Sequence, residues 1–468
     1  MIQLRARRLA AGITIAATLV ATGCSSPFGT RSSGVQSIPE AASPTFQSPF
    51  SMMQPDSHLI KHVVVIVQEN RTVDNLFNGL PGADTVLSGK NKQGQTVQLR
   101  ETPLTAPYDI SHKHSAFIQD YDNGKMDGFN TETENCYSKN SYRCPQADLA
   151  SYAYVPRTDV QPYFDLAEQY TFADRMFQTN QGPSFSAHQY IVSGTSVISN
   201  GSNLKAAENP TDPQGQKRQG GCDSLHDTTV ETIDPAGNES KAVFPCFVRD
   251  SIFHLMNDKS VSWHYYQEFR GSGEWHAVDA LKPIWQSRSF SNVIAPSSKV
   301  LTDINAGQLA DVTFVTPSAQ NSDHPAKNDG TGPSWVASIV NAVGNSAYWK
   351  STAIFVVWDD WGGFYDHAPP TIYNSFEDGF RVPLIVISPY AKKGHVSHVR
   401  YEFGSILKFI EKAFDLGSLG RSDVRAHDLI DCFDFKKSPR PFTTIRAKYS
   451  ASYFEHQPID YDSPDDDY

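Results

Sequence analysis

Short continuous runs of β-branched and aromatic residues alternate with helical patterns along this chain, and this alternation constrains the fold most. The runs occupy residues 62–67, 262–266, 311–315, 353–358 and 383–388. They lack the alternation of apolar and polar residues that a strand with one solvent-exposed face shows. Unbroken apolar runs are typical of parallel strands buried on both faces. The pattern predicts an α/β fold with a mainly parallel sheet sandwiched by helices.

Two apolar stripes with helical spacing are expected to cover this sheet. Ser334 is placed to cap the first helix, and Phe403 begins the second. The stripes are Val336, Ile339, Val340 and Val343 in the first helix, and Phe403, Ile406, Leu407, Ile410 and Phe414 in the second. Such stripes pack into the hydrophobic core, so no cofactor is needed to explain them. The long polar stretches 91–158 and 199–242 are expected to form an irregular rim over the sheet.

The two ends of the chain have compositions of their own. Arg5, Arg7 and Arg8 precede an apolar run at 9–21 and the small residues before Cys24. This order predicts a signal peptide over 1–24, with Cys24 as a candidate for lipidation and membrane tethering. A Ser/Pro-rich linker over 25–57, a catalytic domain over 58–450 and an acidic tail over 451–468 are expected to follow. The protein is therefore expected to be exported and to reside in the periplasm, outside the cell, or on the surface as a lipoprotein.

Charge and cysteine content restrict the partners and the compartment. The chain has 40 Lys and Arg against 51 Asp and Glu, whereas proteins that bind nucleic-acid backbones concentrate basic residues. No nucleic-acid partner is expected, and no signal indicates an oligomeric state.

After export, short spacing favours the disulfides Cys136 with Cys144 and Cys222 with Cys246, leaving Cys432 free. The sequence leaves the connectivity open.

Polar clusters follow three of the expected strands, where open α/β sheets bind ligands. Glu69 and Asn70 follow the first strand, Asp323 and His324 follow the third, and Asp359 and Asp360 follow the fourth. Any one strand-end carboxylate could instead cap a helix. Glu69, Asn70, Asp359 and Asp360 together form an oxygen donor set that suits calcium, magnesium or manganese. Both acids can reach one ion only if the chain turns, which Gly362 and Gly363 favour.

Two further segments carry candidate catalytic groups. Ser184 follows Gly182 and Pro183 at an expected helix start, where it is either a helix N-cap or a nucleophile. It lacks the spacing of a nucleophile elbow, but metal coordination could activate it without a histidine base. His112 and His114 could form a metal pair, but no further zinc ligands lie nearby in the sequence. His112 is better suited to bind phosphate or carry a proton.

Several motifs together resemble one family, the bacterial phosphoesterases that comprise nonspecific phospholipases C and acid phosphatases, relatives of the alkaline-phosphatase superfamily. The first motif is a strand followed by Glu69-Asn70-Arg71-Thr72-Val73-Asp74, where the family usually has Ser-Phe in place of Thr72-Val73. The others lie at 124–129, 180–196, 322–325 and 362–370. The resemblance covers nearly the whole folded region and implies an alkaline-phosphatase-like fold.

The resemblance also implies roles for the candidate residues. Glu69, Asn70, Asp359 and Asp360 match metal-binding positions, and Ser184 matches the hydroxyl nucleophile that the metal activates. His112, Asp323 and His324 match phosphate-contacting and proton-transfer positions, and His367 is a further candidate. The chain departs from the phospholipase pattern at Ser111 and at Phe185-Ser186, which weakens any inference about the substrate.

The expected function is therefore metal-dependent hydrolysis of phosphate esters through Ser184. The chain ends soon after the helix that begins at Phe403, without the extra C-terminal domains of the larger phospholipases, which favours an acid-phosphatase-like phosphomonoesterase. Phospholipase C activity on phospholipid headgroups is the alternative. A serine carboxylesterase, or a lipoprotein that binds phosphorylated ligands without turnover, competes with both.

Overall fold

The centre of the fold is an eight-stranded sheet. The computed structural model describes residues 59–137, 142–213 and 219–461, and Gln54–Tyr468 forms one compact unit. The expected signal peptide, linker and Cys24 lie outside the described residues. In spatial order the strands are β14 (Val293–Ile294), β13 (Trp263–Tyr266), β15 (Val312–Val315), β1 (His62–Gln68), β16 (Thr352–Trp358), β17 (Leu384–Ile387), β8 (Thr171–Ala173) and β18 (His395–Ser397).

The sheet is mainly parallel, as expected. Only β17 runs antiparallel to its neighbours β16 and β8 in this sheet. The expected strand at 383–388 is thus present but reversed in direction. The five expected strands are all found, whereas β14, β8 and β18 were missed because segments of two or three residues carry no readable periodicity.

Strand β1 lies between β15 and β16, and this central position explains the unbroken apolar run in its sequence. Val65 is paired with Phe314 of β15 and with Phe355 of β16. Residues 63–67 of β1 are buried on both faces of the sheet. A strand in this place needs apolar residues at every position.

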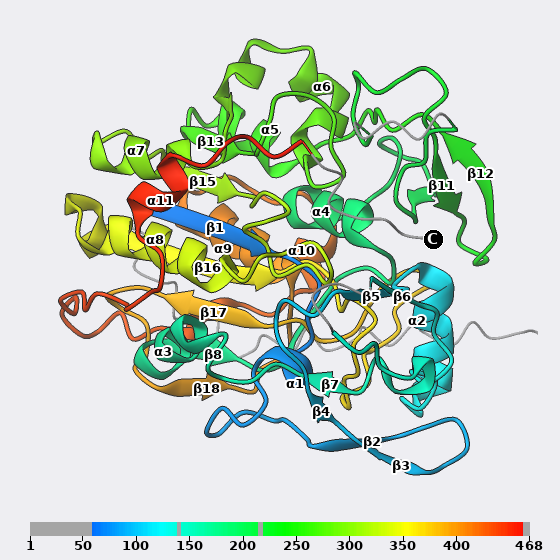
Figure 1. Cartoon of the computed structure of the whole chain (residues 1–468). Coiled ribbons are helices and arrows are strands. Elements are labelled where there is room, and N and C mark those ends of the chain that lie inside the picture. Colours follow the sequence, from blue (N-terminus) through cyan, green and yellow to red (C-terminus); the bar gives the residue numbers. More distant parts are fainter. Residues whose placement is uncertain (1–58, 138–141, 214–218, 462–468) are drawn as a thin grey trace, which may run out of the picture. The chain divides into compact units, whose positions relative to one another are not determined.

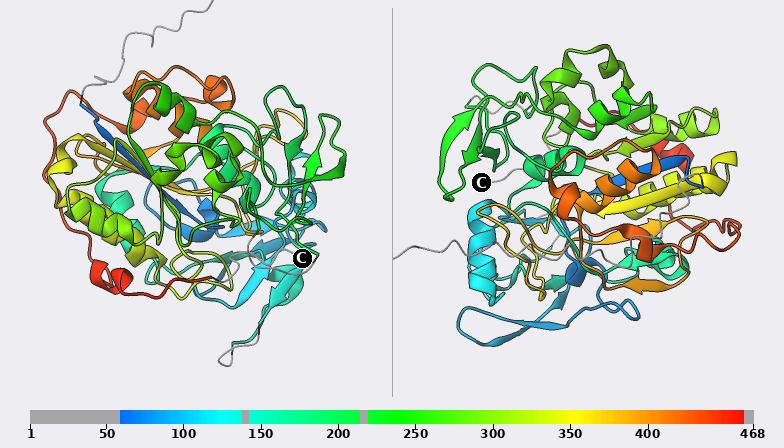
Figure 2. Two further views of the ribbon diagram at one scale, coloured as in Figure 1. Left: turned by 90° about the horizontal axis from the view of Figure 1, so that it is seen from above. Right: turned by 180° about the vertical axis from the view of Figure 1, so that it is seen from behind.

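Helices cover both faces of the sheet (Figures 1 and 2). On one face α8 (Gly332–Gly344) packs against α3 (Gln161–Gln169), α7 (Lys299–Asn305) and α11 (Ala451–Glu455). On the other face α4 (Ser184–Ser193) packs against α5 (Ile252–Asp258) and α9 (Phe403–Ala413), and α9 also contacts α10 (Ser422–Arg425). None of the helices in the described part of the chain is long and apolar enough to span a membrane.

Two expected boundaries are wrong. Thr331, not Ser334, occupies the N-cap position of α8, and Ser334 lies in the first turn of that helix. The tail was expected to start at 451, but α11 begins there and Phe454 is buried against Trp335, with ring centroids 5.3 Å apart. Phe454 is the only buried residue of α11, so the helix has no apolar stripe. The acidic residues that follow it led to the prediction of a tail.

The two long polar stretches form small peripheral sheets. These are β2 (Ser88–Lys90) with β3 (Thr96–Gln98), β4 (Arg100–Glu101) with β7 (Ala153–Tyr154), β5 (Tyr108–Ile110) with β6 (Glu134–Cys136), and β10 (Lys205–Ala206) with β11 (Val230–Ile233) and β12 (Glu239–Val243). Together with α2 (His114–Tyr121), β5, β6, β11 and β12 lie beyond the C-terminal end of β1 in Figure 1. They form the expected rim.

The structure contains the two favoured disulfides. Cys136 is bonded to Cys144, and Cys222 to Cys246. Cys432 is free and buried. The bonded cysteines are 8 and 24 residues apart, so each disulfide closes a short loop.

Candidate functional site

The site begins where β1 and β16 end. The two strands are parallel neighbours with Gln68 paired to Trp358, so the residues that follow them emerge side by side. The Asn70 backbone N–H donates a hydrogen bond of 3.0 Å to Asp359 Oδ1. Glu69, Asn70, Asp359 and Asp360 all have 0% exposed surface. The sheet therefore brings together the four residues expected as metal ligands.

Two turns direct these side chains. Asn70 has a φ of 55° and Gly362 a φ of 60°, both in the left-handed region. A Cβ atom on Gly362 would lie 2.5 Å from the Asn70 carbonyl oxygen, so only glycine fits between the two turns. The Gly362 N–H donates a hydrogen bond of 2.8 Å to Asp360 Oδ1. The expected turn thus holds the Asp360 carboxylate in place.

Ser184 reaches this group from α4. It is the first residue of the helix and Pro183 holds the N-cap position, so the interpretation of Ser184 as an N-cap is wrong. Its Oγ lies 3.0 Å from Asp360 Oδ2 and 3.4 Å from Asn70 Oδ1. The hydroxyl therefore points at the oxygens expected to hold a cation.

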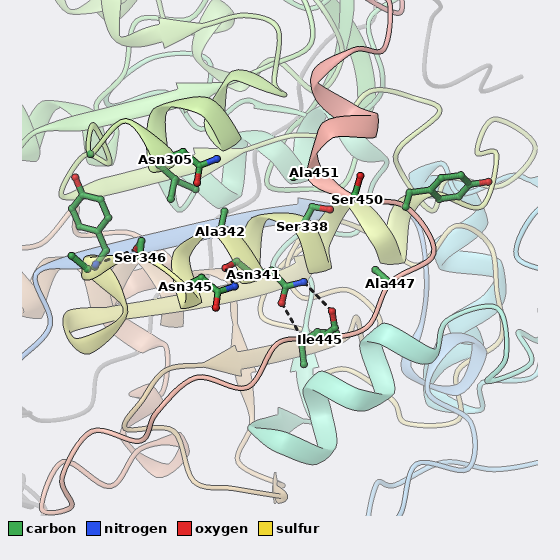
Figure 3. A pocket seen from close by; sticks show the side chains of 15 residues that line it. Asn305, Ser338, Asn341, Ala342, Asn345, Ser346, Ile445, Ala447, Ser450 and Ala451 are labelled. Atoms are coloured by element: carbon green, nitrogen blue, oxygen red, sulfur yellow. Dashed lines mark hydrogen bonds between the residues drawn. The ribbon is translucent and has the colours of Figure 1, made fainter.

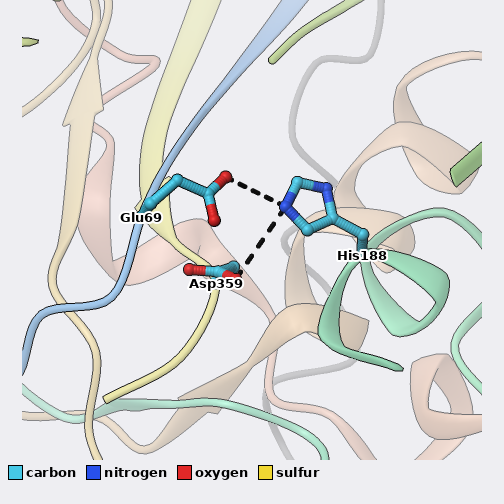
Figure 4. A group of neighbouring side chains, drawn as sticks. All are labelled: Glu69, His188 and Asp359. Carbon is cyan, nitrogen blue, oxygen red and sulfur yellow. Dashed lines mark hydrogen bonds and ion pairs between the residues drawn. The ribbon is translucent and has the colours of Figure 1, made fainter. Parts of the chain in front are cut away.

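His188 joins the site although the sequence reasoning did not select it. Its Nε2 lies 3.0 Å from Glu69 Oε1 and 3.9 Å from Asp359 Oδ2 (Figure 4). Burial lowers the pKa of His188 to about 4. Residues four apart share one face of a helix, so the spacing from Ser184 to His188 was the signal that could have found it.

The donor atoms fit a divalent cation. Glu69, His188 and Asp359 each offer a ligand atom within 4.8 Å of the others. No donor in the described part of the chain makes a hydrogen bond to Asp359 Oδ2, although this atom is buried. A buried carboxylate oxygen without a donor is costly unless a cation neutralises it. His188 adds a nitrogen to the all-oxygen set that the sequence predicted.

His112 orients the Asn70 amide. Its Nδ1 lies 2.8 Å from the Ile110 carbonyl oxygen, so Nδ1 carries the proton and donates it. Its Nε2 then accepts from Asn70 Nδ2 at 3.0 Å. This contact turns Asn70 Oδ1 toward Ser184. His112 therefore contacts an expected metal ligand, while its predicted contact with phosphate or role in proton transfer stays a prediction.

His324 lies beside His112, with ring centroids 6.1 Å apart. Its Nδ1 lies 2.8 Å from the Pro325 carbonyl oxygen, to which it donates. Proton exchange with a substrate would therefore use Nε2. His324 thus lies beside a residue that contacts Asn70, and its role in proton transfer stays a prediction.

Asp323 occupies an anchoring position. Its Oδ2 accepts hydrogen bonds from the Tyr163 hydroxyl at 2.8 Å and from Trp358 Nε1 at 3.1 Å. Burial raises the pKa of Asp323 to about 6. The carboxylate ties β16 to α3, and none of its hydrogen bonds goes to Ser184 or to the cluster at Glu69. The expected role of Asp323 in proton transfer has no counterpart in these contacts.

The structure does not bring His367 to the site. Its Nδ1 lies 2.7 Å from Asp74 Oδ2, and its Nε2 lies 3.2 Å from Asp84 Oδ1. Burial lowers the pKa of His367, but the hydrogen bond and negative charge of Asp74 outweigh it and leave that pKa raised. His367 therefore belongs to a separate ion-pair cluster and is withdrawn as a catalytic candidate.

Asp74, Asp366 and His367 also lie close enough together to hold an ion. Arg381, however, donates hydrogen bonds to both oxygens of Asp366, at 2.8 and 3.1 Å. The guanidinium already supplies the positive charge that a cation would bring. The group around Glu69 is therefore the stronger candidate.

One cavity in the described part of the chain lies away from the candidate site residues. It measures about 770 Å³ and is lined by residues of α7, α8 and the C-terminal segment, including Asn305, Ser338 and Ala451 (Figure 3). Asn341 closes one wall by hydrogen bonds of 2.9 Å to both the N–H and the carbonyl of Ile445. None of the candidate site residues lines it. This cavity is therefore separate from the candidate site.

Comparisons with known proteins agree with the motifs. The sequence model of the Phosphoesterase family matches residues 60–417. The hemolytic phospholipase C of Pseudomonas aeruginosa is 24% identical over 81% of this chain and 56% of its own length. Phospholipase C A of Mycobacterium tuberculosis is 24% identical over 85% and 82%, and non-specific phospholipase C1 of Arabidopsis thaliana is 23% identical over 81% and 72%. This confirms the resemblance to phospholipases C, although the chain spans only 56% of the Pseudomonas hemolytic relative.

Two solved structures show weak likeness. One is a protein in the alkaline phosphatase superfamily from Vibrio parahaemolyticus, with 9% identity and a TM-score of 0.35 over 80% of this chain and 72% of that one. The other is Ps i-CgsB, with 9% identity and a TM-score of 0.37 over 82% and 77%. Such scores are too low to add to what the sheet topology shows.

Proposed function

We propose that this chain, which belongs to the Phosphoesterase family, hydrolyses phosphate esters through Ser184 beside a bound divalent cation. One observation carries the proposal. The Ser184 hydroxyl lies 3.0 Å from Asp360 Oδ2 within a group of buried carboxylates at the ends of β1 and β16. A non-catalytic binding protein has no need for a hydroxyl in this place.

The contacts of Ser184 support a serine nucleophile. Ser184 Oγ attacks phosphorus and forms the Oγ–P bond, while its proton passes to Asp360 Oδ2. The bond from phosphorus to the leaving oxygen breaks, and His324 donates a proton to that oxygen. Water then attacks the phosphoserine and gives a proton to His324, and Ser184 regains its proton from Asp360. Both groups return to their starting states.

The chain's own residues fit a cation and hold one another in place. When bound to Glu69, Asn70, Asp359, Asp360 and Ser184, a divalent ion would stabilise negative charge on the attacking and phosphoryl oxygens. His188 fixes the Glu69 carboxylate by a hydrogen bond of 3.0 Å, and His112 fixes the Asn70 amide. Calcium, magnesium and manganese all suit this set of oxygen ligands.

Phosphomonoesters are the proposed substrates. The formal net charge of −11 does not favour approach to an anionic lipid surface. Phospholipase C activity is the second candidate, because the relatives from Pseudomonas, Mycobacterium and Arabidopsis all carry that name. The contacts of Ser184 serve both reactions.

We expect purified protein to hydrolyse an aryl phosphomonoester with a higher kcat/KM than a choline phosphodiester. A chelator should stop both reactions, because both use the cation site. The measurement compares initial rates on the two substrates, with and without chelator, and again after each cation is restored. Faster cleavage of the diester or of phosphatidylcholine vesicles would favour the phospholipase. Hydrolysis of carboxylic esters that resists chelation would favour a serine carboxylesterase instead.

Export and tethering are part of the proposal. The two disulfides support an oxidising compartment. If Cys24 is lipidated, cells fed a labelled fatty acid should yield labelled protein, and Cys24→Ala should abolish the label. An unlabelled wild-type chain in the soluble fraction would contradict tethering.

A further inference from the structure

Trp275 lies between two histidines of the site. Its ring is parallel to that of His188, with an interplanar angle of 8° and centroids 6.3 Å apart. The ring of His324 lies 5.9 Å away on a tilt of 34°. His188 contacts Glu69, and His324 is the candidate proton donor. The indole therefore contacts both the histidine that binds Glu69 and the histidine proposed to protonate the leaving group.

The segment around Trp275 is held rigidly. The Tyr265 hydroxyl of β13 donates a hydrogen bond of 2.9 Å to the Trp275 carbonyl oxygen and accepts one of 3.3 Å from the Ala277 N–H. Trp275 is 3% exposed. The ring is thus fixed at the site by the central sheet.

The indole N–H of Trp275 has no acceptor. No atom in the described ranges accepts a hydrogen bond from Trp275 Nε1, although the atom is buried. An indole nitrogen can only donate, so this group is unsatisfied until an acceptor arrives. By contrast, the neighbouring indoles of Trp358 and Trp361 donate to Asp323 and Asp120.

We propose that Trp275 binds the substrate, and that its indole N–H donates a hydrogen bond to a non-bridging oxygen of the phosphoryl group. This inference rests on the proposed function. A desolvated donor bonds most strongly to an acceptor that carries negative charge. The phosphoryl group must sit between Ser184 and the proton donor, and Trp275 contacts the ring of His324, which is that proposed donor. A buried water is the alternative acceptor, and the experiment separates the two.

The test is the variant Trp275→Phe, which removes the N–H and keeps an aromatic ring. The dissociation constant of inorganic phosphate is measured by calorimetry on the full chain saturated with the cation that supports turnover. We expect it to rise by about tenfold to a hundredfold, because a hydrogen bond to a charged oxygen is lost. KM for the monoester should rise as well, and metal content should stay unchanged because Trp275 binds no metal.

Trp335→Phe is the matched control. Trp335 Nε1 is also buried without an acceptor among the described residues, but its ring packs against Phe454 in the core. Loss of its N–H should leave phosphate binding within about twofold, since its ring packs against Phe454 and not against the histidines of the site.

Four outcomes would overturn the inference. Unchanged phosphate affinity in folded Trp275→Phe would mean that the indole binds water or nothing. An equal loss in Trp335→Phe would mean a general effect of removing a buried indole. A wild-type protein that binds no phosphate would refute the proposed function, and the role of Trp275 with it. If Trp275→Phe does not fold, one of the seven indole N–H signals of ¹⁵N-labelled wild type should still move downfield on phosphate addition, and no movement would refute the contact.

Discussion

Replacing Ser184 with alanine is expected to lower kcat by about a thousandfold or more, because the covalent step loses its nucleophile. Bound metal should remain, since the carboxylates of Glu69, Asp359 and Asp360 are untouched. Initial rates on an aryl phosphomonoester, together with metal analysis of the same sample, make the measurement. A variant that keeps most of the wild-type rate would remove Ser184 from the mechanism.

Ser186→Ala is the control for this experiment. Ser186 lies in the same turn of α4, and its buried hydroxyl donates a hydrogen bond of 2.8 Å to the Pro183 carbonyl oxygen. Loss of that hydrogen bond should cost about 1 kcal/mol of stability and leave kcat within about tenfold. Equal losses in the two serine variants would indicate damage to the helix rather than loss of a nucleophile.

The second large effect is expected from Asp359→Asn. The change replaces a charged oxygen donor by a neutral one, at a carboxylate whose Oδ2 has no hydrogen-bond donor among the described residues. Metal affinity should fall by about tenfold to a hundredfold, with turnover lost in proportion to occupancy. Asp360→Asn should act in the same direction and also remove the acceptor of the Ser184 proton. Titration of metal into the metal-free protein measures the change.

Asp323→Asn is the matched control for metal binding. Asp323 is also buried, but its hydrogen bonds go to Tyr163 and Trp358. Its substitution should lower stability and leave metal affinity unchanged. Wild-type metal affinity in both Asp359→Asn and Asp360→Asn would exclude these residues as ligands.

The central sheet was predictable because its main strands need unbroken apolar runs. Val63–Val67 of β1 and the run ending at Trp358 are buried on both faces of the sheet. Strands buried in this way need apolar residues at nearly every position, and such runs can be recognised in the sequence. The reversal of β17 was not predictable, because a buried strand has the same composition in either direction. The helix α11 was hidden because Phe454 is its only buried residue, so it has no apolar stripe with helical spacing.

The candidate site was predictable where strand ends and motifs coincide, and less so elsewhere. Glu69 and Asp359 follow adjacent strands, so the sheet itself places them together. His367 lies in a motif near Asp359 along the chain, but Asp74 and Arg381 hold it in a separate cluster. His188 lies in the motif at 180–196 but escaped notice, because only its spacing from Ser184 on a helix connects it to the expected metal ligands.

Trapping the phosphorylated enzyme tests the central claim most directly. The wild-type chain is mixed with a phosphomonoester and its cation, quenched with acid within one turnover, digested, and analysed by mass spectrometry. The proposed mechanism predicts a phosphoryl group on Ser184 that disappears on a longer chase and is absent from Ser184→Ala. Rapid turnover without any phosphorylated peptide, or with the phosphoryl group on another serine such as Ser186, would contradict it.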